Sequence, residues 1–507
     1  MTVVNTNVAA LAAQTSMMKN TRELEDAMAK LSSGYRINTA ADDAAGMSIS
    51  ERLDSQIRGL SQAIRNAQDG QNLIDTVEGA SDEIVVALQR LRELAVQSAT
   101  DTNSAVDRGF INKEAQNLIG EINRIGSNTQ WNGMNVLDGT FVNKNIQAGS
   151  NVNESIGIAV RDLQARGIGN HVIRGKAMED AVATAEASNT IAGGDTVISG
   201  FAGKATITVV EDDSAREFVA DVNNRSNDTG VTADARTNAV LKTLSNDGTV
   251  TIKIGKQGSV DSAGTNVVSG TLSSVSVTAT ITTTDFTNLR DAINNVSGET
   301  GVVASFFNGD VKQILLTDHD GDDIILGDFE HSTASQTMIV QAYDFHGTSN
   351  ASASSGETLT DAASDSVTIT GAVQLSSSQS FQVESTQNTQ FFGAVTFADS
   401  SLDMLGDINL GSAVGSAAAL DVIDGAINMV NTQRATLGAI SNRLDNTVNN
   451  LTNIVENTSA SKSTIKDANF AAETSKLTKA QILNQAATSM LAQANASKQT
   501  VLALLQS

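Results

Sequence analysis

The sequence predicts an α + β multidomain protein, in which a long antiparallel helical bundle or coiled coil is built from both termini and carries inserted β-rich outer domains. Apolar or small residues recur every three or four positions over residues 38–100, and again from residue 420 onward. Over residues 177–400 this helical period fades, and an internal repeat appears. Because a helix as long as 38–100 cannot bury its apolar seam alone, we expect the two ends of the chain to pack together.

The stretch 38–100 is predicted to be one continuous helix. Asp42 and Asp43 stand at its start, where free amide groups and the helix dipole favour a short carboxylate cap. Four glycines, at positions 46, 59, 70 and 79, each cost about 1 kcal/mol relative to alanine, so the helix should depend on partners for order. Its apolar or small seam positions are Leu53, Ile57, Leu60, Ile64, Ala67, Ile74, Val77, Ile84, Leu88, Leu91 and Ala95.

Four further segments have a helical period. Residues 5–33 form the first, with Gly34 placed as its C′ residue. Another begins near Ser104 and ends at Gly126, a third begins at Leu420, and the last covers residues 459–507. The last helix has few charges and a wide apolar surface, which in a soluble protein predicts assembly or a chaperone.

The middle of the chain has the alternation and turns of β-structure. Asn132-Gly133 and Asp138-Gly139 predict tight turns just before it. Residues 222–231 align with 293–302, and LSNDG aligns with LTDHDG, so we expect two small α + β units in tandem, each ending in a hairpin. The Ser/Thr/Ala/Gly-rich tract 346–380 is either a linker or exposed β-structure.

Composition excludes several classes of function. There is no Cys, so thiolate and disulfide chemistry are absent, and there is no Pro to slow refolding. The net charge is −24, of which the segment 141–400 holds −17, and only 3% of residues are aromatic, so we expect no nucleic-acid partner. The N-terminal MTVVNTNVAALAAQ lacks a basic region followed by an apolar core, so we expect no general secretory signal and no membrane partner.

The most tempting chemical site is LTDHDGDDI, with Asp318, Asp320, Asp322, Asp323 and His319. Alternate acids can ligate Ca²⁺, but the spacing and terminal Glu of an EF-hand are missing, and a turn explains both copies of the repeat better. The histidines at 171, 319, 331 and 346 match no catalytic motif. We therefore expect no enzyme, no cofactor and no metal site.

Six motifs resemble the conserved ends of bacterial flagellins. The N-terminal motifs are LSSGYRINTAADDAAGMSIS (31–50), QIRGLSQAIRNAQDGQNLI (56–74), LQRLRELAVQSATDTNS (88–104) and TQWNGMNVLDGTF (129–141). The C-terminal motifs are LGAISNRLDNTVNNL (437–451) and LTKAQILNQAATSMLAQANASKQTVLALL (477–505). Two departures, Trp131 and Lys498, stand where relatives more often have Phe and Pro.

The resemblance implies a subunit that polymerises into the extracellular flagellar filament for motility. It implies the following order of parts: residues 1–37 as an inner-tube helix, 38–176 as a helical shell with a β-hairpin, 177–400 as outer domains with insert repeats at 197–255 and 268–329, 401–458 as a second shell helix, and 459–507 as a second inner-tube helix. The runner-up is a hook-filament junction protein, which shares such ends. An adhesive or glycan-bearing middle stays open.

Partners also follow from the resemblance. They are further copies of the chain, a chaperone on the C-terminal helix, and hook-associated and cap proteins. The resemblance also implies that the chain is exported unfolded by the type III apparatus. Recognition by Toll-like receptor 5 is carried over to Leu88, Gln89, Arg90, Arg92 and Glu114, and recognition by cytosolic immune sensors to Leu502, Leu504 and Leu505. The predicted polymerisation seams are Leu53, Ile57, Leu60, Ile64, Leu437, Leu444, Leu451, Ile482 and Leu491.

Overall fold

The computed structural model describes residues 6–100, 102–178, 189, 191–256, 275–349, 356–361, 365–385, 391–392 and 397–506, with the backbone alone over 498–506. The chain divides into two compact units. The terminal unit comprises Met1–Asp75, Asn143–Ile158 and Leu437–Ser507, and the middle unit comprises Thr76–Val142 and Ala159–Thr436. Two long helices contribute residues to both units, and each unit is described by itself below.

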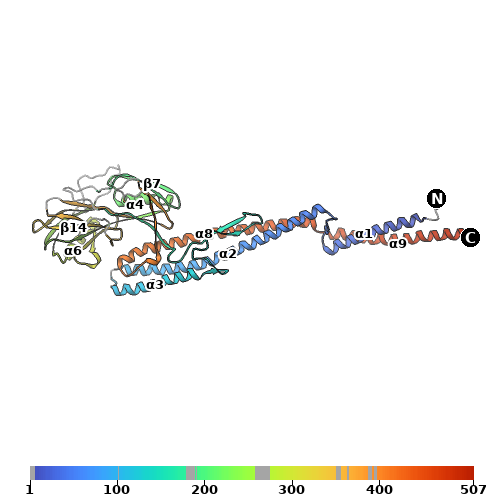
Figure 1. The fold of residues 1–507 in the computed structure, drawn as a ribbon, viewed down its shortest axis with the longest axis horizontal. Helices are drawn as coiled ribbons and strands as arrows, with labels where there is room; N and C mark the ends of the chain where they lie inside the picture. The colour runs from blue at the N-terminus through green and yellow to red at the C-terminus, as the bar shows by residue number, and fades with distance from the viewer. Residues whose placement is uncertain are drawn as a thin grey trace. The chain divides into compact units, whose positions relative to one another are not determined.

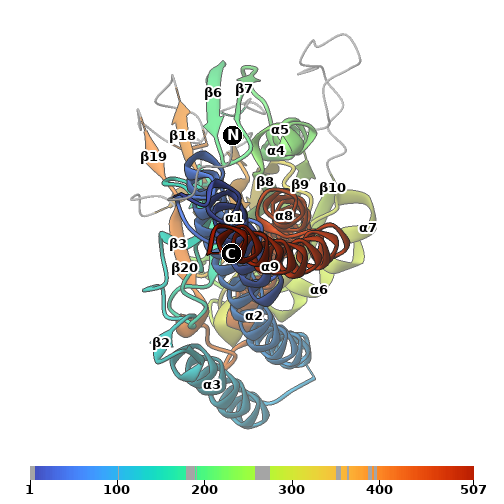
Figure 2. The same ribbon diagram turned by 90° about the vertical axis from the view of Figure 1, so that its right-hand side faces the viewer.

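The terminal unit contains mostly helix. Its elements are α1 (Val8–Ser33), the first part of α2 (Ala44–Ala99), the β3–β4 hairpin (Lys144–Gln147 and Ser155–Ile158), the last part of α8 (Ala413–Lys466) and α9 (Phe470–Gln506). Helix α1 ends at Gly34, whose φ is +75° and whose N–H donates to the carbonyl of Lys30, so the predicted C′ glycine is confirmed. Figures 1 and 2 show α1 and α9 running side by side.

The long helix α2 starts later than residue 38. Asp42 Oδ2 accepts the backbone N–H groups of Asn38 and Thr39 at 3.0 and 2.8 Å, which fixes a loop before the helix. Asp43 Oδ1 accepts the N–H of Gly46 at 2.9 Å, so Asp43 is the cap that the sequence predicted. From Ala44 the helix runs without a break to Ala99.

The predicted boundary at 458/459 between the two C-terminal helices is wrong by eight residues. Helix α8 continues to Lys466, and Lys462 on its last turns pairs with Asp54 of α2. Asn469 Oδ1 then accepts the N–H groups of Ala471 and Ala472 and starts α9. The helix break therefore lies at residues 467–469 because a cap residue is available there and none is used at 458.

The middle unit begins with the rest of α2 and with α3 (Ala105–Asn128). Ser104 and Asp107 form a reciprocal capping box at the start of α3, as the predicted start near Ser104 requires. Strands β1 (Gln130–Trp131) and β2 (Met134–Asn135) pair across Asn132 and Gly133, which both have positive φ, so the predicted tight turn is confirmed.

Three larger sheets build the rest of the middle unit. One has the order β11-β12-β8-β17-β5-β20, with β14 paired to β8 and β15 paired to β14. A second has the order β10-β9-β13-β16, and a third has the order β19-β18-β6-β7. Their strands are β5 (Gly169–Arg174), β6 (Gly194–Ser199), β7 (Lys204–Val209), β8 (Thr232–Lys242), β9 (Gly248–Lys256), β10 (Val275–Ile281), β11 (Val303–Phe306), β12 (Ile314–Asp318), β13 (Ile324–His331), β14 (Thr337–Tyr343), β15 (Glu357–Thr360), β16 (Ser366–Ile369), β17 (Ala372–Ser377), β18 (Gln382–Ser385), β19 (Ala398–Asp399) and β20 (Ser401–Met404).

The internal repeat is visible as two equivalent helix pairs. These are α4 (Ala215–Asn224) with α5 (Ser226–Thr229), and α6 (Thr287–Asn295) with α7 (Ser297–Thr300). They end at Gly230 and Gly301, with φ of +73° and +72°. The predicted terminal hairpins are wrong, because the links β8–β9 and β12–β13 each run from the eight-stranded sheet to the β10-β9-β13-β16 sheet. The two copies therefore share sheets and do not form separate units.

Two further expectations need correction. In the tract 346–380, the described strands β16 and β17 are almost wholly buried, so they are neither linker nor exposed β-structure. Strand β15 of the same tract is largely exposed, as the sequence predicts. Residues 350–355 and 362–364 of this tract, and 268–274 of the second repeat, lie outside the described residues.

Helix α8 is long and apolar enough, by length and composition, to cross a membrane. That is weak support for a membrane span, because core helices pass the same test and Ile423, Ala426 and Val430 of α8 are buried.

Candidate assembly surfaces

Helices α1 and α9 meet along a narrow antiparallel seam. Asn7 Nδ2 donates to the carbonyl of Ala494 at 3.2 Å near one end, and Asn484 Nδ2 donates to Thr21 Oγ1 at 3.3 Å farther along. The buried residues of the seam are Ala27 of α1 and Glu473, Ala480 and Ala487 of α9, so three of the four are small, and their neighbours are partly buried at heptad spacing. The less exposed heptad positions are Ala10, Ala13, Met17, Asn20, Leu24, Ala27 and Leu31 on α1, and Glu473, Leu477, Ala480, Asn484, Ala487, Leu491 and Ala494 on α9.

Large apolar side chains lie outside this seam. On α9, Phe470, Ile482 and Met490 are 63%, 60% and 63% exposed, which is unusual for such side chains on one helix. On α1 the same is true of Val8, Leu11, Met18 and Met28. We call these seven residues, together with Leu483, the outer apolar face. Because this face is large, the α1–α9 pair buries only part of its own apolar surface.

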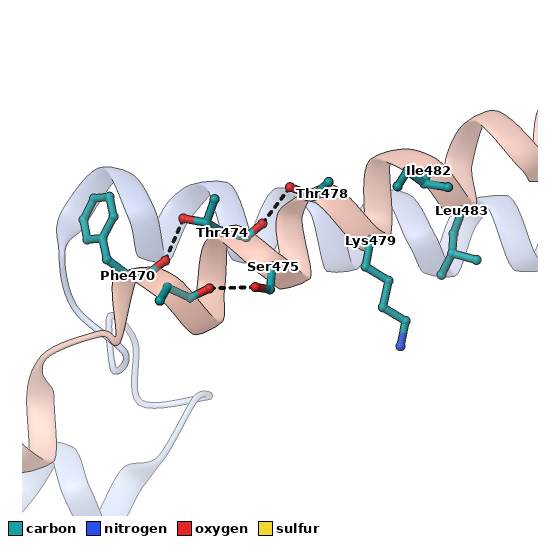
Figure 3. A pocket seen from close by; sticks show the side chains of 8 residues that line it. Phe470, Thr474, Ser475, Thr478, Lys479, Ile482 and Leu483 are labelled. Atoms are coloured by element: carbon teal, nitrogen blue, oxygen red, sulfur yellow. Dashed lines mark hydrogen bonds between the residues drawn. The ribbon is translucent and has the colours of Figure 1, made fainter.

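Figure 3 shows the groove on α9 that contains part of the outer apolar face, with Phe470 at one end and Ile482 and Leu483 at the other. The hydroxyls of Thr474 and Thr478 donate to the carbonyls of Phe470 and Thr474 at 2.6 and 2.9 Å. Because these hydroxyls bond to their own helix, the groove between Phe470 and Ile482 needs no outside polar partner. It suits an apolar side chain from another helix.

The structure divides the predicted polymerisation seams into three groups by burial. Leu60, Leu437, Leu444 and Leu451 are buried inside the chain, and Leu60 and Leu451 pack together in the terminal unit. Leu53, Ile57, Ile64 and Leu491 are partly buried, and Ile482 alone of the nine is largely exposed. Eight of these nine residues are buried or partly buried within the chain and Ile482 is not. Heptad spacing does not say which chain buries a residue. It also passed over Ala480 and Ala487, whose seven-residue interval was the available signal.

The residues of the predicted receptor surface belong to the middle unit and do not all face solvent. Arg90 lies between two carboxylates and pairs with Glu93 on its own helix and with Glu114 of α3, both at 2.8 Å. Arg92 pairs with Asp424 of α8 at 2.7 Å, and Gln89 is exposed. Leu88 is completely buried, so it supports the bundle from inside and is removed from the predicted surface. Leu502, Leu504 and Leu505 lie beyond the side chains that the structure describes.

The acidic segment 318–323 has partners within the protein. Carboxylate oxygens of Asp318, Asp320 and Asp322 lie within 4.8 Å of one another. Asp322 Oδ2 is 3.0 Å from Arg216 and 2.9 Å from Lys256, and Asp318 Oδ1 accepts the N–H groups of Asp320 and Gly321. Burial raises the pKa of Asp318. These contacts favour the turn interpretation, because two protein cations already pair with the buried carboxylate of Asp322.

Comparison with known families agrees with the layout of the two ends. The model of the bacterial flagellin N-terminal helical region matches residues 4–142, and that of the C-terminal helical region matches residues 420–505. These ranges contain α1 to α3, most of α8, and α9.

Similarity to individual proteins covers the whole chain. The B-type flagellin of Pseudomonas aeruginosa is 35% identical over 507 residues, which cover 99% of each chain. Flagellin C of Vibrio cholerae is 31% identical over 502 residues, with the same coverage. The solved structure of FliC from Burkholderia pseudomallei is 17% identical, and the alignment covers 74% of this chain and 99% of that chain. Its TM-score is 0.30, which is too low to support a conclusion. Full-length identity above 30%, with a family match at each end, shows that the chain belongs to the bacterial flagellins, the structural subunits of the extracellular flagellar filament.

Proposed function

We propose that this flagellin polymerises through the outer apolar face of α1 and α9, and that these helices become stably folded only when further copies cover that face. The observation that carries the proposal is the exposure of Val8, Leu11, Phe470, Ile482 and Met490, each at 60% or more. Helix α1 buries only Ala27 within the chain, which is too little to hold an isolated helix of its length. Docking of copies supplies the missing burial.

The energies are sufficient for strong assembly. Burial of one large apolar side chain contributes about 1.5–3 kcal/mol, and several such side chains are exposed on each subunit. Ordering the two helices costs part of this gain, which makes assembly dependent on the full set of contacts. We infer that α1 and α9 form an inner tube, the rest of the helical bundle a surrounding shell, and the sheets of the middle unit the outer domains.

We also propose how the chain is exported and which proteins meet its ends. An unfolded α9 would expose the apolar side chains that line the groove of Figure 3, which supports masking by an export chaperone. Cap and hook-associated proteins would then meet the same terminal helices at the two ends of the filament. The full-length identity to flagellins favours a filament subunit over a junction protein.

The test is seeded growth of Ile482→Gln with Met490→Gln, measured by electron microscopy and sedimentation. Because both side chains lie on the outer apolar face, the double variant should raise the critical concentration for growth at least about 100-fold. Ser489→Gln, at an exposed polar position of the same helix, is the matched control and should polymerise normally. Normal growth of the double variant would overturn the proposal.

A further inference from the structure

A cavity of about 660 Å³ in the middle unit is not used by the assembly surfaces. Its walls come from α8, from strands β5, β8 and β17, and from the turn between β6 and β7. The lining includes the carboxylates of Asp234, Asp421 and Asp424, side-chain amides and hydroxyls, and the ring of Phe201 is its aromatic member. The volume lies within the range of small-molecule sites, so the question is which chemistry would fill it.

The turn between β6 and β7 holds Phe201 at the edge of this cavity. A Cβ at Gly230 would lie 2.2 Å from the ring of Phe201, and one at Gly200 would lie 2.0 Å from the carbonyl oxygen of Thr229. The N–H of Ala202 also donates to that carbonyl at 3.3 Å. Figure 2 shows the β6–β7 hairpin beside α5. The close glycine contacts fix the ring in place while 51% of the residue stays exposed, instead of letting it join the core around Phe218.

Several polar side chains of the lining hold hydrogen-bond acceptors in fixed positions. Gln374 is 3% exposed and bridges two charged groups: its Nε2 donates to Asp421 Oδ2 at 3.1 Å, and its Oε1 accepts from Arg174 Nε at 3.0 Å. Asp234 Oδ1 accepts the N–H of Ala235 at 3.0 Å, and among the described residues no group donates to its other oxygen. Asn170, also buried, donates to Ser376 Oγ at 3.2 Å. Acceptors at fixed positions therefore face a cavity with one aromatic edge.

We propose that this cavity binds a neutral saccharide, whose hydroxyls donate to Asp234 and Asp421 while its apolar face lies on Phe201. Anionic ligands are disfavoured by three carboxylates, of which only Asp424 has a described arginine partner, Arg92. A large apolar ligand would cover the carboxylates and amides of the lining without giving them hydrogen-bond partners. Burial raises the pKa of Asp421. The aromatic edge supplies the apolar contact that a pyranose ring needs.

The test uses saturation-transfer difference NMR on the full chain with three probes: methyl α-glucopyranoside, methyl β-galactopyranoside and N-acetylglucosamine. At least one probe should give saturation transfer to its ring protons. Phe201→Ala should weaken binding about three- to tenfold, and Asp234→Asn about tenfold or more. Phe397→Ala, at another exposed phenylalanine, and Glu330→Gln, at an exposed acid of β13, should bind as the unchanged protein does.

Three results would overturn the proposal. The first is the absence of saturation transfer from the protein to any of the three probes. The second is binding that Phe201→Ala and Asp234→Asn leave unchanged, since the saccharide would then lie elsewhere. The third is binding of spermidine at this cavity with no binding of the pyranosides, which would assign it to cations. Seeded polymerisation of each variant should stay normal, which separates this site from the assembly surfaces.

Discussion

We propose Arg90 as the side chain on which recognition by Toll-like receptor 5 depends most directly. It is half-exposed, and its guanidinium is held by Glu93 and Glu114 in a defined orientation. A pre-oriented arginine costs less side-chain entropy on binding than a free one. We infer that Arg90, Gln89 and Glu114 form the part of the predicted receptor surface that is open to contact, with Arg92 beside them.

The residue-scale prediction concerns receptor signalling by purified monomer. Arg90→Ala with Glu114→Ala should raise the half-maximal concentration for Toll-like receptor 5 signalling about tenfold or more, because it removes an exposed arginine anchor. Arg124→Ala with Glu121→Ala removes another exposed ion pair on α3 and is the matched control. Equal signalling by the two double variants would show that Arg90 and Glu114 are not part of the recognised surface.

Single residues show where sequence reasoning succeeded and where it could not. Asp43 and Gly34 were predictable because caps depend on neighbours a few residues away. The inward position of Leu88 and the pairing of Asp322 with Arg216 and Lys256 depend on contacts distant in the sequence. No local pattern contains them, which is why the sequence predicts Leu88 at the surface and does not reveal the partners of the acidic segment.

The glycines of the long helix α2 allow other elements to pack closely against it. A Cβ at Gly70 would lie 3.3 Å from Ile146 of the β3–β4 hairpin and 3.3 Å from Leu444 of α8, both within the terminal unit. A Cβ at Gly46 would lie 2.7 Å from Ile37. At Gly79 a Cβ would meet nothing within 4 Å. Three of the four glycines, Gly59 included, therefore allow close packing, and Gly79 only costs helix stability.

The element-scale prediction compares two substitutions in α2 by thermal unfolding of the monomer. Gly79→Ala should stabilise the protein by about 0.5–1 kcal/mol, because alanine restricts the unfolded chain and favours helix. Gly70→Val should destabilise it by more than about 1 kcal/mol, because the added methyl groups displace Ile146 and Leu444. A destabilising Gly79→Ala, or a neutral Gly70→Val, would contradict this account of the helix.

Helix existence was predictable at the element scale, and strand pairing was not. The periods of α1, α2, α3, α8 and α9 are visible in the sequence because each helix buries a stripe. The route of the chain between sheets is not, since LSNDG and LTDHDG have the composition of hairpin turns yet join strands of different sheets. The 458/459 boundary failed for a related reason: the last turns of α8 are kept helical by Lys462 and its partner Asp54.

At the scale of the whole molecule, the account depends on incomplete burial. The middle unit has large buried clusters around its sheets, whereas the α1–α9 pair has a thin seam of alanines and a broad outer apolar face. A chain with this distribution should be stable in its middle and dependent on other copies at its ends. Assembly and folding of the terminal helices are then one process.

The most direct test is removal of residues 468–507, followed by circular dichroism and electron microscopy with and without filament seeds. This cut keeps α8 whole, with its contact between Lys462 and Asp54. The account predicts that the full chain gains helix as it extends the seeds, while the shortened chain stays folded and soluble and forms no filament. Filaments grown from the shortened chain, or growth of the full chain with no gain in helix, would contradict it.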